Sequence, residues 1–158
     1  KYDFVKISFA DKLKSIVSQI YGIPVSYCYD NKNFELQGTN LRKLLQKWGN
    51  AGRDIDKDTW IFSVREFINS YLIKNRSVVI DDVRMQNEAQ FIRDEGGFLV
   101  KIVRPEIQSN DFDISETEQE HIVADFVLVN DGSLDYLKKK LDLTMKQINK
   151  KFWGGRGG

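Results

Sequence analysis

Two carboxylates and a guanidinium stand close together in the middle of the chain, at Asp81, Asp82 and Arg84. A carboxylate can hold Mg²⁺ directly or through water, because this ion prefers oxygen ligands and keeps several of its waters. The guanidinium of an arginine offers a planar fork of N–H donors that matches the oxygens of a phosphate group. Together, these residue types suit a phosphorylated ligand bound with a metal ion. A purely structural alternative is that the aspartates cap the following helix and that one of them pairs with Arg84.

The segments around these residues have the pattern of a β-α-β unit. Residues 78–80 are apolar and β-branched, as in a strand that is buried on both faces. Apolar residues at helical spacing follow at Met85, Ala89 and Ile92, and residues 98–103 have the composition of a second strand. Such units build parallel sheets, in which ligands sit past the carboxyl ends of the strands. The unit therefore places the three charged residues where a ligand would bind.

The other elements are predicted from the spacing of apolar residues and from capping residues. Strands are expected at residues 3–9 and 124–129. Residues 25–38 show no clear period, and we expect a loop or a lid-like insertion there. The other expected helices begin near polar residues, namely Asp11, Thr39, Asp58 or Thr59, and Ser133. The first of these helices is expected to end at Gly22.

A glycine-flanked break is predicted between two of these helices, at residues 49–54. The backbone can approach a ligand closely at such a turn, and Arg53 on it could reach a phosphate group. The helix after the break carries a wide apolar stripe that includes Trp60. Stripes of this kind usually form the core, so Trp48 and Trp60 receive no binding role from the pattern alone.

Length and composition limit the class of protein. The chain has 158 residues, of which 30% are charged and 41% are apolar, and its net charge is +1. This balance gives no case for a nucleic-acid or membrane partner, and no segment approaches the roughly 18 apolar residues of a membrane span. Cys28 and His121 are each single in the sequence, which excludes a disulfide framework within the chain and leaves too few ligands for a His/Cys zinc site. One cysteine fits a reducing, cytoplasmic setting.

We expect a single domain over residues 1–151. It would contain a helical substrate-binding insertion at about 25–75 and a lid-like, acidic excursion at about 106–120. The glycine-rich residues 152–158 are expected to form a flexible tail.

With its elements in this order, the chain resembles the deoxynucleoside monophosphate kinases of bacteriophage type, which have the P-loop kinase fold. The resemblance runs over nearly the whole chain. The stretch from Val79 to Glu88, followed by Gly96 and Gly97, is its most specific part. The other three stretches that carry it are residues 8–14, 44–60 and 130–134. The resemblance implies an α/β fold with three layers, α/β/α, around a mostly parallel sheet.

The resemblance also implies an activity, the transfer of a phosphoryl group from ATP to a deoxynucleoside monophosphate to give the diphosphate. Catalysis of this kind is mostly positioning and charge stabilisation, and Mg²⁺ is its usual cofactor. The partners would be small-molecule nucleotides, with no nucleic acid and no membrane.

On the acceptor side, the resemblance implies that Asp82 organises Mg²⁺ or its waters. Arg84 and Arg53 would hold the acceptor monophosphate, while Gln46 and Trp60 would shape its pocket.

On the donor side, the resemblance places Arg104 beside the lid, within reach of the transferred phosphate. Asn130 and Asp131 would lie near the base of the donor nucleotide. In the lid itself, the family often has a His two residues before Ser-Glu, and this chain has Asp113 at that position.

The chain departs from the family most clearly in its phosphate-binding loop. No glycine is followed by lysine, so the Walker A pattern G-x-x-x-x-G-K-[ST] is not found in these residues. In the family, the strand, loop and helix that carry this pattern lie just before the strand expected at residues 3–9. We therefore expect an N-terminally incomplete copy of the fold, with ATP turnover absent or very weak in these residues alone. Two apolar strand edges would be left unpaired, which is a poor design for a stable monomer, so a homodimer is also considered.

Two other functions stay open at this point. A degenerate, non-catalytic relative could bind a nucleotide or a partner protein through the same crevice. A nucleic-acid-binding module could use Arg156 and residues 138–140, although the near-neutral net charge argues against it. The sequence names neither the accepted base nor which of Asp81 and Asp82 faces the crevice, because neighbours on a strand point to opposite faces.

Overall fold

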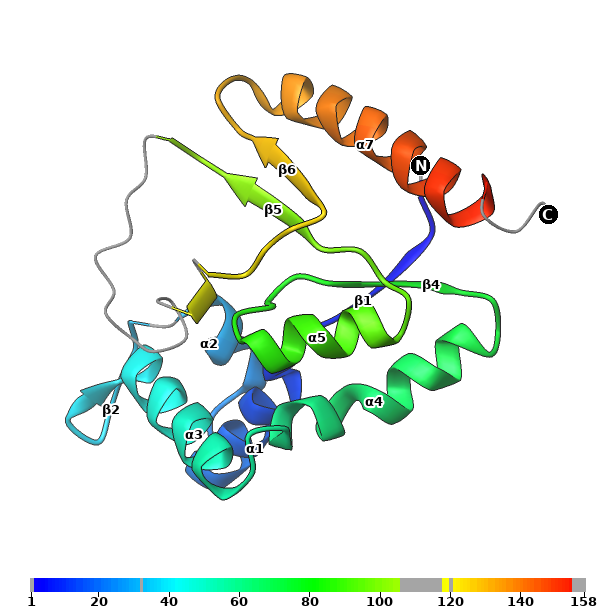
Figure 1. The fold of residues 1–158 in the computed structure, drawn as a ribbon. Helices are drawn as coiled ribbons and strands as arrows, with labels where there is room; N and C mark the ends of the chain where they lie inside the picture. Colours follow the sequence, from blue (N-terminus) through cyan, green and yellow to red (C-terminus); the bar gives the residue numbers. More distant parts are fainter. Residues whose placement is uncertain (1, 32, 106–117, 120, 155–158) are drawn as a thin grey trace. The chain divides into compact units, whose positions relative to one another are not determined.

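The computed structural model describes residues 2–31, 33–105, 118–119 and 121–154. It shows a mixed α/β protein that divides into two compact units, Lys1–Glu88 and Ala89–Gly158. Figure 1 shows the elements of both units in chain order.

The first unit contains a pair of parallel strands, β1 (Phe4–Ile7) and β4 (Ser77–Ile80). Their register pairs Phe4 with Ser77 and Ile7 with Ile80, so both strands end at the same edge. The strands predicted in these two places are confirmed. Residues that follow the two strands are thereby brought together, although they are more than seventy positions apart in the sequence.

Helix α1 (Ala10–Tyr21) follows β1 and ends at Gly22, whose φ of +63° lies in the left-handed region that glycine adopts without a Cβ penalty. The predicted end of this helix is confirmed. Its predicted cap is wrong, because Asp11 lies inside the first turn and accepts the Ser8 N–H at 3.0 Å. No side chain from α1 or its N-cap residue, Phe9, caps the helix.

Residues 25–38 are more ordered than their composition predicts. They form the short helix α2 (Val25–Asp30) and most of a hairpin of β2 (Glu35–Leu36) with β3 (Thr39–Asn40). Six residues are too few to show a helical period, which explains why the prediction of a loop is wrong. The hairpin turn has positive φ at both central residues, Gln37 and Gly38, as a tight two-residue turn requires.

The glycine-flanked break predicted at residues 49–54 is also wrong, because helix α3 (Leu41–Ile55) runs through it. The helix begins after Asn40, one residue beyond the predicted cap, and the Asn40 side chain accepts the Lys43 N–H. The glycines serve packing instead of a turn, since the indole of Trp60 on helix α4 (Thr59–Leu72) lies against Gly52 and donates to the Gly49 carbonyl at 3.0 Å.

The second unit contains a second pair of parallel strands, β5 (Val100–Val103) and β6 (Phe126–Val129). Helix α5 (Gln86–Asp94) leads into this unit from the first. Helix α7 (Leu134–Gly154) follows β6 and packs against it. These elements confirm the predicted helix after residue 85 and the strands and helix predicted after it. The β-α-β unit is not shown as one parallel sheet, because among the described strands β4 pairs with β1 and β5 pairs with β6.

Helix α7 is longer than predicted and includes residues 152–154, which were assigned to a flexible tail. Extending an existing helix by one turn costs little compared with starting one, which explains why these residues join α7. Most of the predicted lid, residues 106–117 and 120, lies outside the described residues, and so does Asp113.

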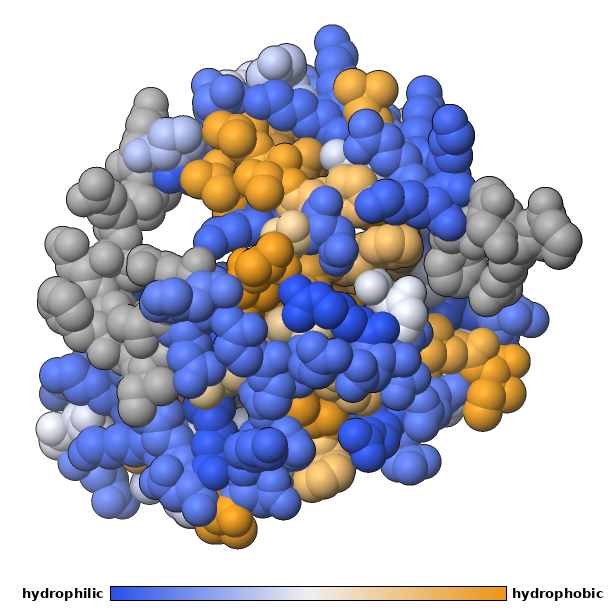
Figure 2. All heavy atoms as spheres, in the orientation of Figure 1, coloured by the Kyte–Doolittle hydropathy of each residue, from blue (hydrophilic) through white to orange (hydrophobic). Residues whose placement is uncertain are grey.

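Among the described strands, β4 pairs only with β1, and β5 pairs only with β6. Apolar side chains reach the surface on the β5–β6 sheet, where Ile102 is 63% exposed and Val127 is 58% exposed. Figure 2 shows hydrophobic side chains gathered over these strands. In the described part of the chain, no helix has the length and apolar character needed to cross a membrane.

The contact between Gly52 and Trp60 predicts a strong difference between two neighbouring glycines. A Cβ at Gly52 would lie 2.5 Å from Cζ2 of the buried Trp60 ring, which cannot turn aside. We expect Gly52→Ala to lower the free energy of unfolding by about 1–3 kcal/mol, as overpacking usually does. Urea unfolding followed by circular dichroism measures this change.

Gly49→Ala is the matched control in the same helix. A Cβ there would make only ordinary contacts, at 3.5 Å from Leu13 and Arg53. Alanine favours a helix by up to about 1 kcal/mol over glycine, so this variant should be neutral or more stable. If Gly52→Ala and Gly49→Ala were equally stable, the Trp60 ring would not be packed tightly against Gly52.

Candidate functional site

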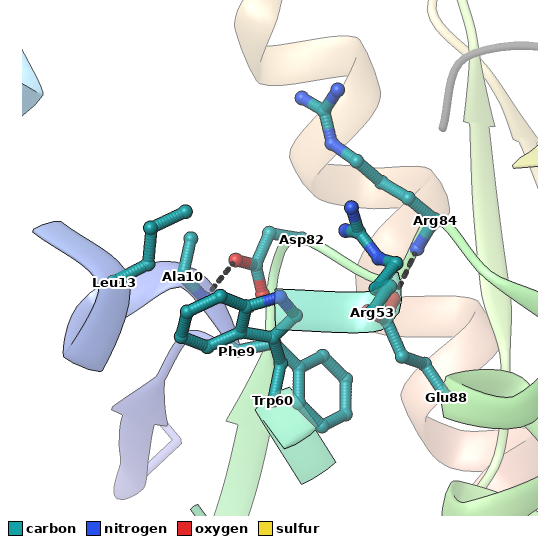
Figure 3. A pocket seen from close by; sticks show the side chains of 8 residues that line it. All are labelled: Phe9, Ala10, Leu13, Arg53, Trp60, Asp82, Arg84 and Glu88. Carbon is teal, nitrogen blue, oxygen red and sulfur yellow. Dashed lines mark hydrogen bonds between the residues drawn. The ribbon is translucent and has the colours of Figure 1, made fainter. Parts of the chain in front are cut away.

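A pocket opens in the first unit at the edge where β1 and β4 end (Figure 3). It encloses about 310 Å³, including space that is open to solvent. The lining residues come from α1, α3, α4, the segment after β4 and the start of α5. They are Phe9, Ala10, Leu13, Arg53, Trp60, Asp82, Arg84 and Glu88.

Asp82 holds the start of α1 through both of its carboxylate oxygens. Oδ1 accepts the Phe9 N–H at 2.9 Å, and Oδ2 accepts the Ala10 N–H at 3.0 Å. These amides belong to the first turn of the helix, where backbone donors have no partner within the helix. Burial raises the pKa of Asp82, although the two backbone hydrogen bonds oppose this effect.

Asp81 points to different partners. Its Oδ1 accepts from the Ser8 hydroxyl at 2.6 Å, and its Oδ2 lies 2.7 Å from the ammonium of Lys6. Partial burial disfavours the charged form, but the hydrogen bonds from Lys6 and Ser8 outweigh it and lower the pKa of Asp81. Of the two neighbours, Asp82 is therefore the one that lines the pocket. The alternative that both aspartates cap the following helix is wrong, because both turn back to the end of β1.

Glu88 caps the following helix instead. Its Oε2 accepts the N–H groups of Arg84 at 2.8 Å and of Met85 at 3.1 Å, just before α5 begins. The residue is buried, which raises its pKa against the effect of these two hydrogen bonds. Sequence reasoning did not single out Glu88. The available signal was the three-residue spacing from Met85 to Glu88 at a helix start, where Glu often closes a capping box.

Arg53 and Arg84 bring two guanidinium groups to the same pocket from different elements. Arg53 lies in the last turn of α3, and its Nη1 donates to Asn50 Oδ1 at 3.1 Å. Arg84 follows β4, and its backbone is fixed by Glu88. Because a guanidinium has five N–H donors, the pair can bind an anion while keeping contacts to the protein.

The apolar wall of the pocket includes Trp60, which is 7% exposed. Its ring N–H is committed to the Gly49 carbonyl, so the residue offers shape and not a hydrogen bond. Gln46 lies two turns before Arg53 on α3, is half-buried, and is not among the lining residues. The structure thus brings Asp82, Arg84, Arg53 and Trp60 together, without Gln46.

The other predicted site residues belong to the second unit. Arg104 is exposed directly after β5, and the Asn130 N–H donates to the Val103 carbonyl at 2.7 Å. Asp131 lies 2.7 Å from the ammonium of Lys140, and the hydrogen bond from that lysine lowers its pKa. Lys140 is thereby tied to the turn before α7.

Comparison with known proteins gives concordant matches. A sequence model of the deoxynucleotide monophosphate kinase family matches residues 4–141. A protein of Acanthamoeba polyphaga mimivirus, described provisionally as a deoxynucleotide monophosphate kinase, is 34% identical over 153 residues, which cover 84% of this chain and 78% of that protein. The deoxynucleotide monophosphate kinase of Enterobacteria phage T4 is 32% identical over 115 residues, which cover 69% of this chain and 46% of that protein.

The contacts of Asp82 and Asp81 predict that these neighbours differ in their effect on stability. Asp82→Ala leaves the amides of Phe9 and Ala10 without their acceptor, and we expect a loss of about 2–3 kcal/mol in the free energy of unfolding. Asp81→Ala breaks contacts of a side chain that is 46% exposed, so the loss should stay below about 1 kcal/mol. Urea unfolding of both variants at neutral pH measures the difference. Similar losses would show that Asp82 does not hold α1.

The two carboxylates should also change stability with pH in opposite directions. A raised pKa means that folded Asp82 binds its proton more tightly than the unfolded chain does. The part of its contribution that depends on this proton is then complete below the ordinary pKa of 3.8 and is lost as the pH rises through the folded pKa, whereas the hydrogen bonds from Phe9 and Ala10 remain. Asp81 has a lowered pKa, so its contribution is present above 3.8 and is lost as the pH falls through the folded value.

Asp82→Asn and Asp81→Asn isolate these two effects. With rising pH, the stability of the wild type relative to Asp82→Asn should fall, whereas that relative to Asp81→Asn should rise. Unfolding free energies measured at several pH values from acid to neutral check both slopes. If both stability differences changed with pH in the same direction, the raised pKa of Asp82 and the lowered pKa of Asp81 could not both be correct.

Proposed function

The chain belongs to the deoxynucleotide monophosphate kinase family, and from this premise we propose that its first unit binds the monophosphate that accepts a phosphoryl group. The reaction would transfer this group from ATP to a deoxynucleoside monophosphate and give the diphosphate. One observation carries the proposal for this chain, namely that Arg53, Arg84 and Asp82 line a single pocket.

The charges of the pocket support an acceptor phosphate at this place. Arg53 and Arg84 can donate several N–H groups to phosphate oxygens, in the bidentate manner that suits guanidinium. Phe9, Leu13 and Trp60 form an apolar wall that can contact the sugar or the base. Gln46, two turns before Arg53 on α3, is proposed to shape the pocket further along this helix.

The residues present also fit a role near Mg²⁺. Each oxygen of Asp82 accepts one backbone N–H and keeps another lone pair, which suits hydrogen bonds from metal-bound water. In the part of the chain that the structure describes, no three acidic, His or Cys residues gather as a metal site. When bound, Mg²⁺ would neutralise charge on the phosphates of ATP. Asp82 is therefore proposed to orient waters of the ion.

The second unit is proposed to serve the donor side of the reaction. Arg104 would contact the transferred phosphate, and Asn130 and Asp131 would lie near the base of ATP. A three-layer α/β/α arrangement around a mostly parallel sheet is part of the same proposal. These roles come from the family resemblance, and the parallel β5–β6 pair with α7 supports them.

Monophosphate binding by calorimetry tests the acceptor site directly. We expect dGMP, dTMP or dCMP to bind, and Arg84→Ala to weaken the affinity about 10- to 100-fold, because a hydrogen bond to a charged group contributes about 1.5–3 kcal/mol. Binding is measured instead of ATP turnover, because the Walker A pattern, which binds the phosphates of ATP, is not found in these residues.

Arg76→Ala is the matched control. Arg76 belongs to the same unit, lies at the opposite end of β4, and pairs with Asp3 on the surface. It should leave the affinity unchanged. Deoxyguanosine, which lacks the phosphate, should bind weakly and show no effect of Arg84→Ala. A folded chain that binds none of the three monophosphates would rule out the proposed acceptor site and favour a non-catalytic relative.

A further inference from the structure

We propose that Tyr29 and Asp11 are positioning residues for this pocket. Together they fix the turn between β1 and α1, so that Phe9 and Ala10 stay in the pocket wall and Asp82 stays in place for the ligand. The inference rests on the proposed function, because it assigns residues to the same acceptor site. Neither Tyr29 nor Asp11 lines the pocket itself.

One carboxylate, that of Asp11, bridges α2 and the turn after β1. Tyr29 on α2 donates its hydroxyl to Asp11 Oδ1 at 2.6 Å. The other oxygen of Asp11 accepts the Ser8 N–H at 3.0 Å, and the Asp11 N–H donates back to the Ser8 carbonyl at 3.1 Å. Asp11 thereby connects α2 to the turn that leaves β1.

The turn after β1 is also linked to the pocket. The amides of Ser8, Phe9 and Ala10 are consecutive, and each of them donates to a carboxylate. Asp11 takes the first of these amides, and Asp82 takes the next two. A shift of the turn would therefore move the hydrogen-bond partners of Asp82 and two residues of the pocket wall at once. Asp11 restrains the same turn through its own hydrogen bond from the Ser8 N–H.

The surroundings of Tyr29 keep it in position as a donor. The Lys14 ammonium lies 3.9 Å from the centre of the Tyr29 ring and 3.9 Å from Asp11 Oδ1. The Lys14 side chain is only 14% exposed, and its backbone carbonyl lies 3.7 Å from the sulfur of the buried Cys28. Although Tyr29 is 42% exposed, its partial burial and then the hydrogen bond to Asp11 raise the pKa of its hydroxyl, which keeps its proton at neutral pH.

A purely structural role would also be served by these contacts, because they tie α2 to α1. The two roles differ in what they change. A structural tie affects stability, whereas a positioning role changes the affinity for the monophosphate and the protection of the turn amides. An experiment must therefore record both affinity and protection, beside stability.

Tyr29→Phe removes only the hydroxyl and keeps the ring over Lys14. We expect faster amide hydrogen exchange at Ser8 and Phe9 and a three- to tenfold weaker affinity for the monophosphate that binds best, which is the order of effect expected from losing one hydrogen bond. Exchange is followed by NMR and affinity by calorimetry. Tyr27→Phe is the matched control, since Tyr27 lies on the same helix with its ring against Phe34. It should change neither quantity.

A double-mutant cycle tests whether Tyr29 acts through Asp11. Asp11→Ala should weaken the affinity at least as much as Tyr29→Phe, and the double variant should be no weaker than Asp11→Ala alone. Additive effects would overturn the proposed route. Wild-type exchange rates in Tyr29→Phe, or faster exchange with unchanged affinity, would each overturn the proposal.

Failure of the proposed function gives a different result. In that case the folded wild-type chain binds none of the monophosphates, whatever the variants do. Amide hydrogen exchange at Ser8 still tests whether Tyr29 restrains the turn, because this measurement needs no ligand. Faster exchange in Tyr29→Phe would then uphold the link, and unchanged exchange would overturn it.

Discussion

The first unit depends on the contact between the Asp82 carboxylate and the start of α1. A helix start presents N–H groups that have no partner within the helix, and neither the N-cap residue Phe9 nor its neighbours in α1 supply a capping side chain. Asp82 supplies the acceptor from the end of β4. One half-buried carboxylate therefore joins the end of β4, the exit of β1 and the helix that forms a wall of the pocket. Its burial is unfavourable for the charge, and the two amides offset only part of that cost, so its pKa stays raised.

The same principle explains how a pocket with two arginines and two acidic residues can still favour an anion. The oxygens of Asp82 and the Oε2 atom of Glu88 accept backbone N–H groups, which spread their negative charge into the protein. Arg53 and Arg84 both line this pocket, and each guanidinium carries five N–H donors. Because Asp82 and Glu88 cap helix starts, Arg53 and Arg84 are the charged residues of the pocket best suited to bind an anionic ligand.

The sequence predicted most elements but not the contacts that assemble the site. Strands β1 and β4 and helix α5 follow from local patterns of apolar residues, and such patterns need no knowledge of tertiary contacts. The break predicted at Gly49 and Gly52 was wrong because glycine has a low intrinsic helix propensity. In the structure, the Trp60 ring packs so closely against Gly52 that only glycine fits there. Arg53 was identified as a site residue, but it is held by a helix and not by a turn. Glu88 was missed because a capping residue at a helix start has no apolar signal of its own.

Asp81 and Asp82 show why residue type alone could not assign the site. They are adjacent and chemically identical, but backbone geometry sends them to different surroundings. Asp81 meets a lysine and a hydroxyl at a partly exposed surface, and its pKa falls. Asp82 is half-buried against backbone amides, and this burial raises its pKa. The partners that decide between these outcomes, Ser8, Phe9 and Ala10, are about seventy residues earlier in the chain. Only the parallel register of β1 and β4 brings them to the same edge, so the role of each aspartate is fixed by strand pairing and not by the local motif.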